Sequence, residues 1–220
     1  MEEIVRLNGI QKMYGKRSII NNLDLTVRKG EFISITGKSG EGKTTLLNLI
    51  GLLDTFQGGT YLFDGHDVSK KVGIRALIRS RNIGFIFQDY CLLENLSVLD
   101  NILMPFFYSE ESLTKSIYVK VDEYLERFGL TELKRTKTKF LSGGEKQRVS
   151  IVRAMLKEPS LILADEPTGN LDPDNSSVIS SELKKLSQMG TAVVVVTHNQ
   201  NVFENVDTKY KLSDGRVHYE

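Results

Sequence analysis

The hydrophobic pattern of this chain changes from one segment to the next. Short continuous apolar runs at 31–37, 81–87, 161–165 and 191–198 have the length and the β-branched content of buried strands. Runs that are apolar on both faces are typical of parallel strands covered by helices on two sides. Residues 58–65 predict a further short strand between turns.

Segments whose apolar residues have helical spacing lie between and after these strands. Residues 43–53 predict a helix directly after the first strand, and the pattern from 92 to 157 is helical. Glycines stand where two of the helices should end. The apolar helix faces are Ile117, Val121, Leu125 and Phe128, ended by Gly129; Val149, Val152 and Met155; and Ile179, Leu183 and Leu186, ended by Gly190.

The order of the elements predicts the fold class. Strands that alternate with helices indicate an α/β fold with a parallel core sheet, and the tail 210–219 predicts a hairpin with its turn at Asp214–Gly215. We expect a single domain over residues 1–220. A core with an antiparallel β subdomain occupies about 1–88 and 158–220, and an inserted helical subdomain occupies about 89–157.

Composition narrows the function classes. The 220 residues are 40% hydrophobic and carry a net charge of +1, so no global field attracts nucleic acid or anionic lipid. A single cysteine, Cys91, excludes an internal disulfide and fits a reducing compartment. The N-terminus lacks a secretory pattern, and no run approaches the roughly 18 apolar residues of a membrane span. If the protein acts at a membrane, we expect another chain to cross it.

A glycine-rich loop predicts a phosphate site. Gly37, Gly42, Lys43 and Thr44 match G-x-x-x-x-G-K-T, with a strand before the loop and a helix after it. Backbone N–H groups and the helix N-terminus favour phosphate, Lys43 reaches its oxygens, and the Thr44 hydroxyl can bind Mg²⁺. The alternative is a glycine turn that only joins the strand to the helix.

Polar residues that end other strands predict a metal ligand and a base. Asp165 suits Mg²⁺, while Glu166, whose side chain diverges from it, is placed to polarise a water for attack on a γ-phosphate. Gln88 can reach the metal or the water, and His198 can reach the γ-phosphate. The alternative for the two carboxylates is a solvated loop start.

The segment LSGGEKQ, residues 141–147, predicts a second phosphate site. Ser142 and Glu145 form a capping-box pattern, which explains these two residues but not the glycines Gly143 and Gly144. Each glycine costs a first helical turn up to about 1 kcal/mol against alanine. A molecule lying against the backbone explains them, and the first loop already covers one side of a triphosphate. We therefore expect Ser142 to serve the nucleotide of another copy, in a head-to-tail homodimer.

Over essentially the whole chain, these segments resemble the nucleotide-binding subunit of an ATP-binding cassette (ABC) transporter. Residues 141–147 resemble the signature motif, which is specific to this family among P-loop proteins. Residues 37–45 resemble Walker A, and 161–166 resemble Walker B. The resemblance implies a P-loop NTPase with a RecA-like core, an ATPase activity, and ATP and Mg²⁺ as cofactors.

The resemblance also implies a set of site residues. Tyr14 lies where the family stacks an aromatic ring on adenine. The implied residues are Tyr14, Gly37, Lys38, Ser39, Gly40, Glu41, Gly42, Lys43, Thr44 and Thr45 for ATP; Glu166, His198 and Gln88 for catalysis; Thr44, Gln88 and Asp165 for the metal; Leu141, Ser142, Gly143, Gly144, Glu145 and Gln147 for the ATP of the other copy; and Asn170, Leu171 and Asp172 for the D-loop.

Three local features add to this picture. Glu41 stands where the family usually has a small residue, and because an acid would repel phosphate we expect its side chain to point outward. After Gln88, we expect exposed Tyr90, Leu92 and Leu93 to form a groove for a short helix of a membrane partner. The alternative is ordinary packing in the helical subdomain. Cys91 is expected to be a small buried apolar residue.

Within the family, residues 46–54, 83–90 and 163–172 most resemble the group of the MacB and LolD ATPases. The resemblance implies export of peptide, lipoprotein or drug through an integral-membrane permease, with the ATPase on the cytoplasmic face. It implies no nucleic-acid partner. The alternatives are an FtsE-like ATPase that drives a non-transporting membrane complex, a soluble ABC ATPase, or a module that holds ATP without turnover.

Overall fold

The computed structural model describes residues 2–69, 72–107, 112–169, 171–198, 203 and 205–220. The strands are β1 (Glu3–Tyr14), β2 (Arg17–Arg28), β3 (Phe32–Thr36), β4 (Gly58–Phe63), β5 (His66–Asp67), β6 (Ile83–Ile86), β7 (Leu161–Asp165), β8 (Ala192–Val196), β9 (Thr208–Ser213) and β10 (Arg216–Tyr219). The helices are α1 (Lys43–Ile50), α2 (Val72–Asn82), α3 (Val98–Phe107), α4 (Lys115–Arg127), α5 (Gly143–Met155) and α6 (Pro173–Gln188), with 3₁₀ turns η1 (Thr131–Leu133) and η2 (Thr138–Phe140).

A mostly parallel sheet forms the centre of the molecule. Its strand order is β10-β9-β3-β8-β7-β6, in which only the edge strand β10 runs antiparallel to its neighbour. The turn of the β9–β10 hairpin has φ values of 52° at Asp214 and 73° at Gly215, as a two-residue turn of type I′ requires. The predicted α/β fold with a parallel core sheet is therefore confirmed.

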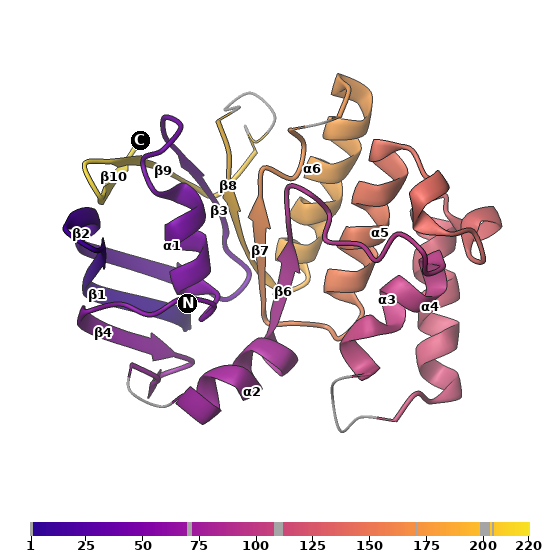
Figure 1. Cartoon of the computed structure of the whole chain (residues 1–220), viewed down its shortest axis with the longest axis horizontal. Coiled ribbons are helices and arrows are strands. Elements are labelled where there is room, and N and C mark those ends of the chain that lie inside the picture. The colour runs from indigo at the N-terminus through magenta and orange to yellow at the C-terminus, as the bar shows by residue number, and fades with distance from the viewer. Residues whose placement is uncertain (1, 70–71, 108–111, 170, 199–202, 204) are drawn as a thin grey trace.

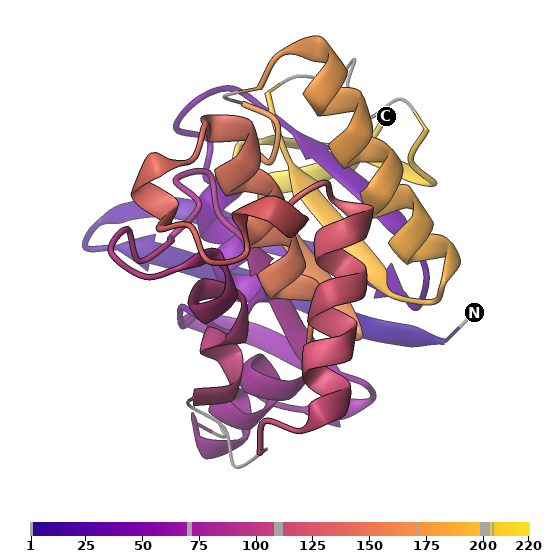
Figure 2. The same ribbon diagram turned by 90° about the vertical axis from the view of Figure 1, so that its right-hand side faces the viewer.

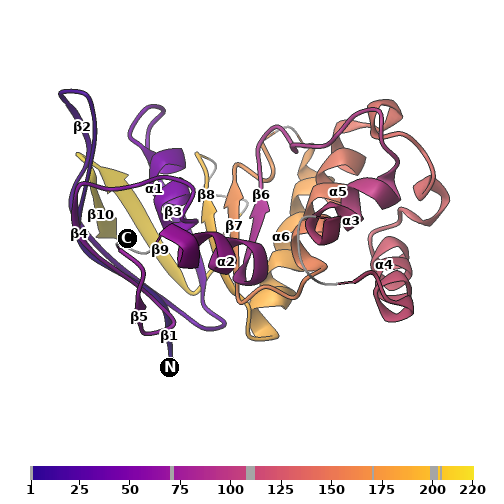
Figure 3. The same ribbon diagram turned by 60° about the horizontal axis from the view of Figure 1, so that its bottom comes forward.

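The apolar runs are buried on both faces of this sheet. Ile33 and Ile35 of β3 belong to one core cluster, and Phe32 belongs to the other. The first cluster is shared with α1 and the antiparallel strands, and the second with α3 to α6. Figure 3 shows this layering, with the antiparallel sheet and α1 on one side of the parallel strands and the helices α3 to α6 on the other. Figure 2 looks onto the helical side.

A separate antiparallel sheet covers α1. Its strand order is β2-β1-β4-β5, and β1 pairs with β2 along nearly its whole length. In β1, residues buried against α1 alternate locally with exposed ones, as expected for a sheet with one face exposed to solvent. Only the strand at 58–65 had been predicted here individually. The irregular registers between β1 and β2 weaken the period-2 signal on which a sequence prediction depends.

Two predicted boundaries differ from the structure. The helix expected at 43–53 ends at Ile50, because Gly51 caps it and Leu52 takes a left-handed φ of 57°. The strand expected from residue 81 begins at Ile83, because α2 continues to Asn82. Among the residues with a described structure, none of the helices is both long and apolar enough for a bilayer crossing.

The sheet places the candidate site at one edge. β3, β6, β7 and β8 run parallel, so their carboxyl ends lie together (Figure 1). Gly37, Gln88, Glu166 and His198 follow these ends within two residues. Open α/β sheets bind ligands at this edge.

Candidate functional site

The loop between β3 and α1 forms the floor of the site. Gly42 has a φ of 98°, and a Cβ there would lie 2.7 Å from Ile19 Cγ2, so only glycine fits without movement. The Lys43 ammonium folds back over the loop and donates to the carbonyls of Gly37 at 2.7 Å and Lys38 at 3.1 Å. A cation and the N-terminus of α1 are thus held at one place, as an anion site requires.

Glu41 lies in this loop but faces away from the space above it. Its carboxylate accepts a hydrogen bond from the backbone N–H of Lys38 at 2.6 Å. The side chain is not among the described residues that line the cavity over the loop. Its orientation is the outward one expected from charge repulsion.

A cavity of about 440 Å³ brings the predicted residues together. It is open on one side and reaches from the loop to the ends of β6, β7 and β8. Its lining contains the predicted residues Ser39, Gly40, Gly42, Lys43, Thr44, Thr45, Gln88, Asp165, Glu166 and His198, and also Arg17 and Ile19 of β2, which were not predicted. The "YGKR" stretch at residues 14–17 is a short hairpin turn beside Tyr14, and this signal could have indicated Arg17.

Thr44 and Asp165 form the part of the cavity that suits a metal ion. Burial raises the pKa of the Asp165 carboxyl above its usual value, while a hydrogen bond from the Thr44 side chain acts in the opposite direction. No cluster of three His, Cys, Asp or Glu residues suitable for a metal occurs in the described part of the chain. Hydroxyl, amide and single carboxylate oxygens from Thr44, Gln88 and Asp165 match Mg²⁺, which keeps other positions for water and phosphate.

Glu166 is held by the segment that follows β8. Its carboxylate accepts hydrogen bonds from the Thr197 hydroxyl at 2.9 Å and the His198 backbone N–H at 2.9 Å. The His198 ring Nδ1 lies 2.8 Å from the same carboxylate. The side chain of Glu166 is only 10% exposed, whereas that of His198 is 68% exposed. The carboxylate is therefore fixed, and the imidazole stands at the rim of the cavity.

Ser142 begins α5 away from this cavity. The predicted capping box is present: Ser142 Oγ accepts from Glu145 N at 3.4 Å, and Glu145 Oε2 accepts from Ser142 N at 2.7 Å. A Cβ on Gly144 would meet its nearest neighbours at 3.6 Å, which is ordinary contact distance. No residue of 141–147 is among the described residues that line the cavity. Packing within the chain therefore does not explain a glycine at position 144.

The other residues predicted to lie at the contact with a second copy differ in their surroundings. Leu141 and Gln147 are 7% and 2% exposed, so both side chains are buried within their own chain. Leu171 packs partly against the helical core, and Asp172 caps α6 by accepting from Asn175 N at 2.9 Å. Asn170 lies outside the described residues.

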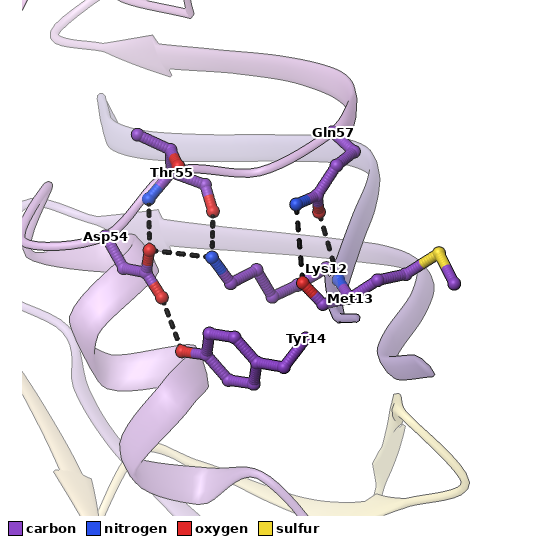
Figure 4. A network of polar contacts seen from close by, with 6 residues as sticks. All are labelled: Lys12, Met13, Tyr14, Asp54, Thr55 and Gln57. Carbon is purple, nitrogen blue, oxygen red and sulfur yellow. Dashed lines mark hydrogen bonds and ion pairs between the residues drawn. The ribbon is translucent and has the colours of Figure 1, made fainter. Parts of the chain in front are cut away.

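Tyr14 stands beside the cavity, at the end of β1. It is 51% exposed and is not among the described lining residues. Its hydroxyl donates to Asp54 at 2.5 Å (Figure 4). The Thr45 side chain is a second hydrogen-bonding neighbour. The sequence prediction missed Asp54 and the neighbouring Lys12, because no local pattern connects residues that lie 42 positions apart.

A second hollow of about 360 Å³ is lined by residues that flank Gln88 in the sequence, Phe87 and Cys91. It differs from the predicted groove, because it is lined by Cys91 and not by Tyr90, Leu92 or Leu93. Tyr90 and Cys91 have φ values of 62° and 46°, and this left-handed turn directs Cys91 outward, so the expectation that Cys91 is buried is wrong. The lining consists of Arg79, Ser80, Arg81, Ile83, Gly84, Phe85, Phe87, Cys91, Met104, Pro105, Arg153, Ala154, Lys157 and Pro159.

Comparison with known proteins shows which family this chain resembles. A sequence model of the family described as ABC transporter matches residues 20–169. The lipoprotein-releasing system ATP-binding protein LolD 1 of Rhodopseudomonas palustris is 35% identical and is covered over 99% of both chains. The macrolide export ATP-binding/permease protein MacB of Campylobacter jejuni is 40% identical over 97% of this chain, but only 33% of that longer protein is covered.

Solved structures agree with the sequence comparison. A dimeric structure of the bacterial ABC transporter cassette MJ0796 superimposes with a TM-score of 0.90. Its sequence is 36% identical, with 98% of this chain and 97% of that chain covered. A second structure of the same cassette is described as a dimeric post-hydrolysis state bound to ADP and Pi.

Proposed function

This chain belongs to the ABC transporter family, and we propose that it is the ATPase subunit that drives a membrane permease through ATP-dependent head-to-tail pairing of two copies. One observation supports the pairing of two copies. The phosphate loop and the catalytic carboxylate share a cavity, whereas Ser142 begins a different helix and no described residue of 141–147 lines that cavity. A second copy supplies the missing side.

ATP binds across the floor of the cavity. Its phosphates lie on the backbone N–H groups of residues 39–45, with Lys43 turned from the loop carbonyls to the phosphate oxygens. Thr44, Gln88 and Asp165 would hold Mg²⁺, which would neutralise charge on the phosphate oxygens. The adenine lies against the ring of Tyr14, and Arg17 lines the cavity above the loop.

Glu166 acts as the general base. Its carboxylate takes a proton from the water that attacks the γ-phosphorus, and the bond between the γ-phosphorus and the bridging oxygen breaks to give ADP and phosphate. Thr197 and the backbone of His198 hold the carboxylate in place. Glu166 and the γ-phosphate can both accept from His198 only when both ring nitrogens carry a proton, with Nδ1–H on the carboxylate and Nε2–H on the phosphate.

The γ-phosphate of each ATP joins the two copies. It lies between Lys43 of one copy and the Ser142 hydroxyl and α5 N-terminus of the other. The lack of a side chain at Gly144 leaves room for the phosphate to approach the backbone. Packing within its own chain does not require a glycine there, because a Cβ would fit. Leu171 and Asp172 of the D-loop lie at the same seam. Loss of the γ-phosphate removes the bridge, so hydrolysis loosens the pair.

The hollow beside Gln88 receives the membrane partner. It combines apolar surface from Phe85, Phe87 and Met104 with the cations of Arg79 and Arg153. A short amphipathic helix with an acidic end fits this chemistry. The chain then acts on the cytoplasmic face of the membrane through its permease, and the relatives' names favour release of a lipoprotein or export of a macrolide. Residues 89–157 would move as a helical subdomain with the partner.

Gel filtration with ATP tests the proposal. Glu166→Gln, which keeps the size of the side chain but cannot accept a proton, should lower turnover at least about 100-fold and accumulate an ATP-bound dimer. Adding Ser142→Arg should return this variant to monomer size while leaving nucleotide binding intact. A Glu166→Gln dimer that persists with Ser142→Arg would contradict the composite site.

A further inference from the structure

A buried lysine beneath Tyr14 has no part in the site described so far. Lys12 is 4% exposed, and its ammonium donates to Asp54 Oδ1 and to the Thr55 carbonyl, both at 2.7 Å. Figure 4 shows these contacts between the end of β1 and the segment after α1. A buried ammonium is costly unless it is paired and hydrogen-bonded, and here both conditions are met.

Asp54 connects this lysine to the exposed ring. Its Oδ2 accepts the Tyr14 hydroxyl at 2.5 Å, and its Oδ1 also accepts the Thr55 backbone N–H at 2.6 Å. The Lys12 ammonium lies 4.6 Å from the centroid of the Tyr14 ring, within the range of a cation–π contact. The ring is therefore held at its hydroxyl end and is approached by a cation.

The backbone that carries the ring is fixed as well. Met13, which precedes Tyr14, donates its N–H to Gln57 Oε1 at 3.0 Å and accepts from Gln57 Nε2 at 3.4 Å (Figure 4). Tyr14 is nevertheless 51% exposed. A half-exposed ring that is tethered at both its backbone and its hydroxyl is pre-ordered, so a ligand that stacks on it loses less conformational freedom on binding.

The tether comes from the helix that carries the phosphate loop. Asp54 follows the C-terminal turn of α1, and its backbone N–H donates to the carbonyl of Asn48 at 3.2 Å. The Thr45 side chain in the first turn of α1 is a further neighbour of the Tyr14 hydroxyl. The ring and the phosphate cradle are thus attached to one rigid element, which sets the spacing between a base and its phosphates.

We propose that Asp54, supported by Lys12, is a positioning residue that holds Tyr14 as a stacking platform for the purine of ATP. This inference rests on the proposed function, in which Tyr14 contacts the adenine. Neither Asp54 nor Lys12 touches the nucleotide. Their effect reaches the ligand only through the ring, so it should depend on the presence of a base.

Binding of ATP and of inorganic tripolyphosphate, measured by calorimetry on the full chain, tests this role. Tyr14→Phe removes only the tethering hydroxyl. Asp54→Asn removes the negative charge of the carboxylate that contacts both Lys12 and Tyr14. Each should weaken ATP binding about five-fold, the effect of one hydrogen bond, and should leave tripolyphosphate binding unchanged. In steady state, the KM for ATP should rise while kcat stays constant. Tyr219→Phe, at an exposed tyrosine outside the site, is the matched control.

A double-mutant cycle separates positioning from stability. In a Tyr14→Ala background, Asp54→Asn should cause no further loss of ATP affinity, because the tethered ring is gone. Unchanged ATP binding in Tyr14→Phe and Asp54→Asn, or an equal loss for ATP and tripolyphosphate, would overturn the inference. If Tyr14→Ala itself binds ATP as the parent does, the adenine contact in the proposed function fails instead.

Discussion

The His198 ring is in direct contact with the Glu166 carboxylate, with 2.8 Å between Nδ1 and Oε1. The two residues come from the ends of neighbouring strands, β7 and β8, which pair in register at Asp165 and Val196. Glu166 has a left-handed φ of 45°, so its backbone turns the carboxylate toward the segment after β8. The geometry of the base is therefore set by the neighbouring strand as well as by its own.

Thr197→Val should reduce turnover without weakening ATP binding. The Thr197 hydroxyl is one of three groups that hold the Glu166 carboxylate, and a displaced base transfers protons less well. We expect kcat to fall about 10-fold while the KM for ATP stays within about two-fold. Steady-state phosphate release measures both. Thr208→Val, which removes a hydroxyl bonded to Glu31 outside the site, is the control, and equal kcat values in the two variants would contradict this role.

Lys43→Ala should weaken nucleotide binding. The ammonium that now bridges two loop carbonyls would contact phosphate oxygens, and hydrogen bonds to charged groups contribute about 1.5–3 kcal/mol. The dissociation constant for ATP should rise about 10- to 100-fold, measured by calorimetry or by a fluorescent analogue. Lys29→Ala, at a surface ion pair with Glu2 and Asp64, should bind ATP as the parent does. If Lys43→Ala behaves like this control, the phosphate assignment is wrong.

Arg153→Met should uncouple the ATPase from its membrane partner. Arg153 donates to the carbonyls of Tyr90 at 2.7 Å and Cys91 at 2.5 Å, and so holds the left-handed turn that lies between Gln88 and the proposed docking hollow. Methionine keeps the length of the side chain but cannot donate. Stimulation by the reconstituted permease should fall about 10-fold, while the unstimulated rate stays within about two-fold.

The control for this variant is Arg6→Met, which breaks only an exposed ion pair with Glu3. It should keep full stimulation by the permease. The uncoupling prediction fails if Arg153→Met also keeps full stimulation.

Glu145→Gln should lower stability in a pH-dependent way. Hydrogen bonds from the Ser142 backbone and side chain lower the pKa of the Glu145 carboxyl below its usual value of 4.5. A lowered pKa means that the contribution to stability is complete above the unfolded value and is lost as the pH falls through the folded value. At pH 7 the parent should be more stable than the variant by about 0.5–1 kcal/mol, typical of an acid at a helix N-terminus.

Urea unfolding at a series of pH values measures this difference. The gap between the parent and Glu145→Gln should narrow once the pH falls below about 4.5 and should close below the folded pKa. Glu126→Gln, at an exposed position in α4, controls for the loss of one carboxylate. A gap that stays constant down to acid pH would show that the charge of Glu145 has no effect.

Much of the fold was predictable because its signals are local. The buried runs at β3, β7 and β8 and the glycine loop before α1 each lie within a few consecutive residues. The apolar faces of α4, α5 and α6 likewise follow from helical spacing. The antiparallel strands β1 and β2 were missed because bulges interrupt their alternation, and α2 was missed although its C-terminal end overlaps the strand predicted from residue 81.

The sequence by itself determined the α/β class, the ABC family and the positions of the phosphate loop and the Ser142 helix start, since each depends on residue types at short fixed spacings. Only the tertiary structure decided that Lys12 and Asp54 tether Tyr14, that Cys91 faces a hollow, and that Ser142 lies outside its own chain's cavity. These relations join residues far apart along the chain, and they depend on how the strands and helices pack. Chain stereochemistry acts over a few residues, whereas packing selects which distant side chains meet.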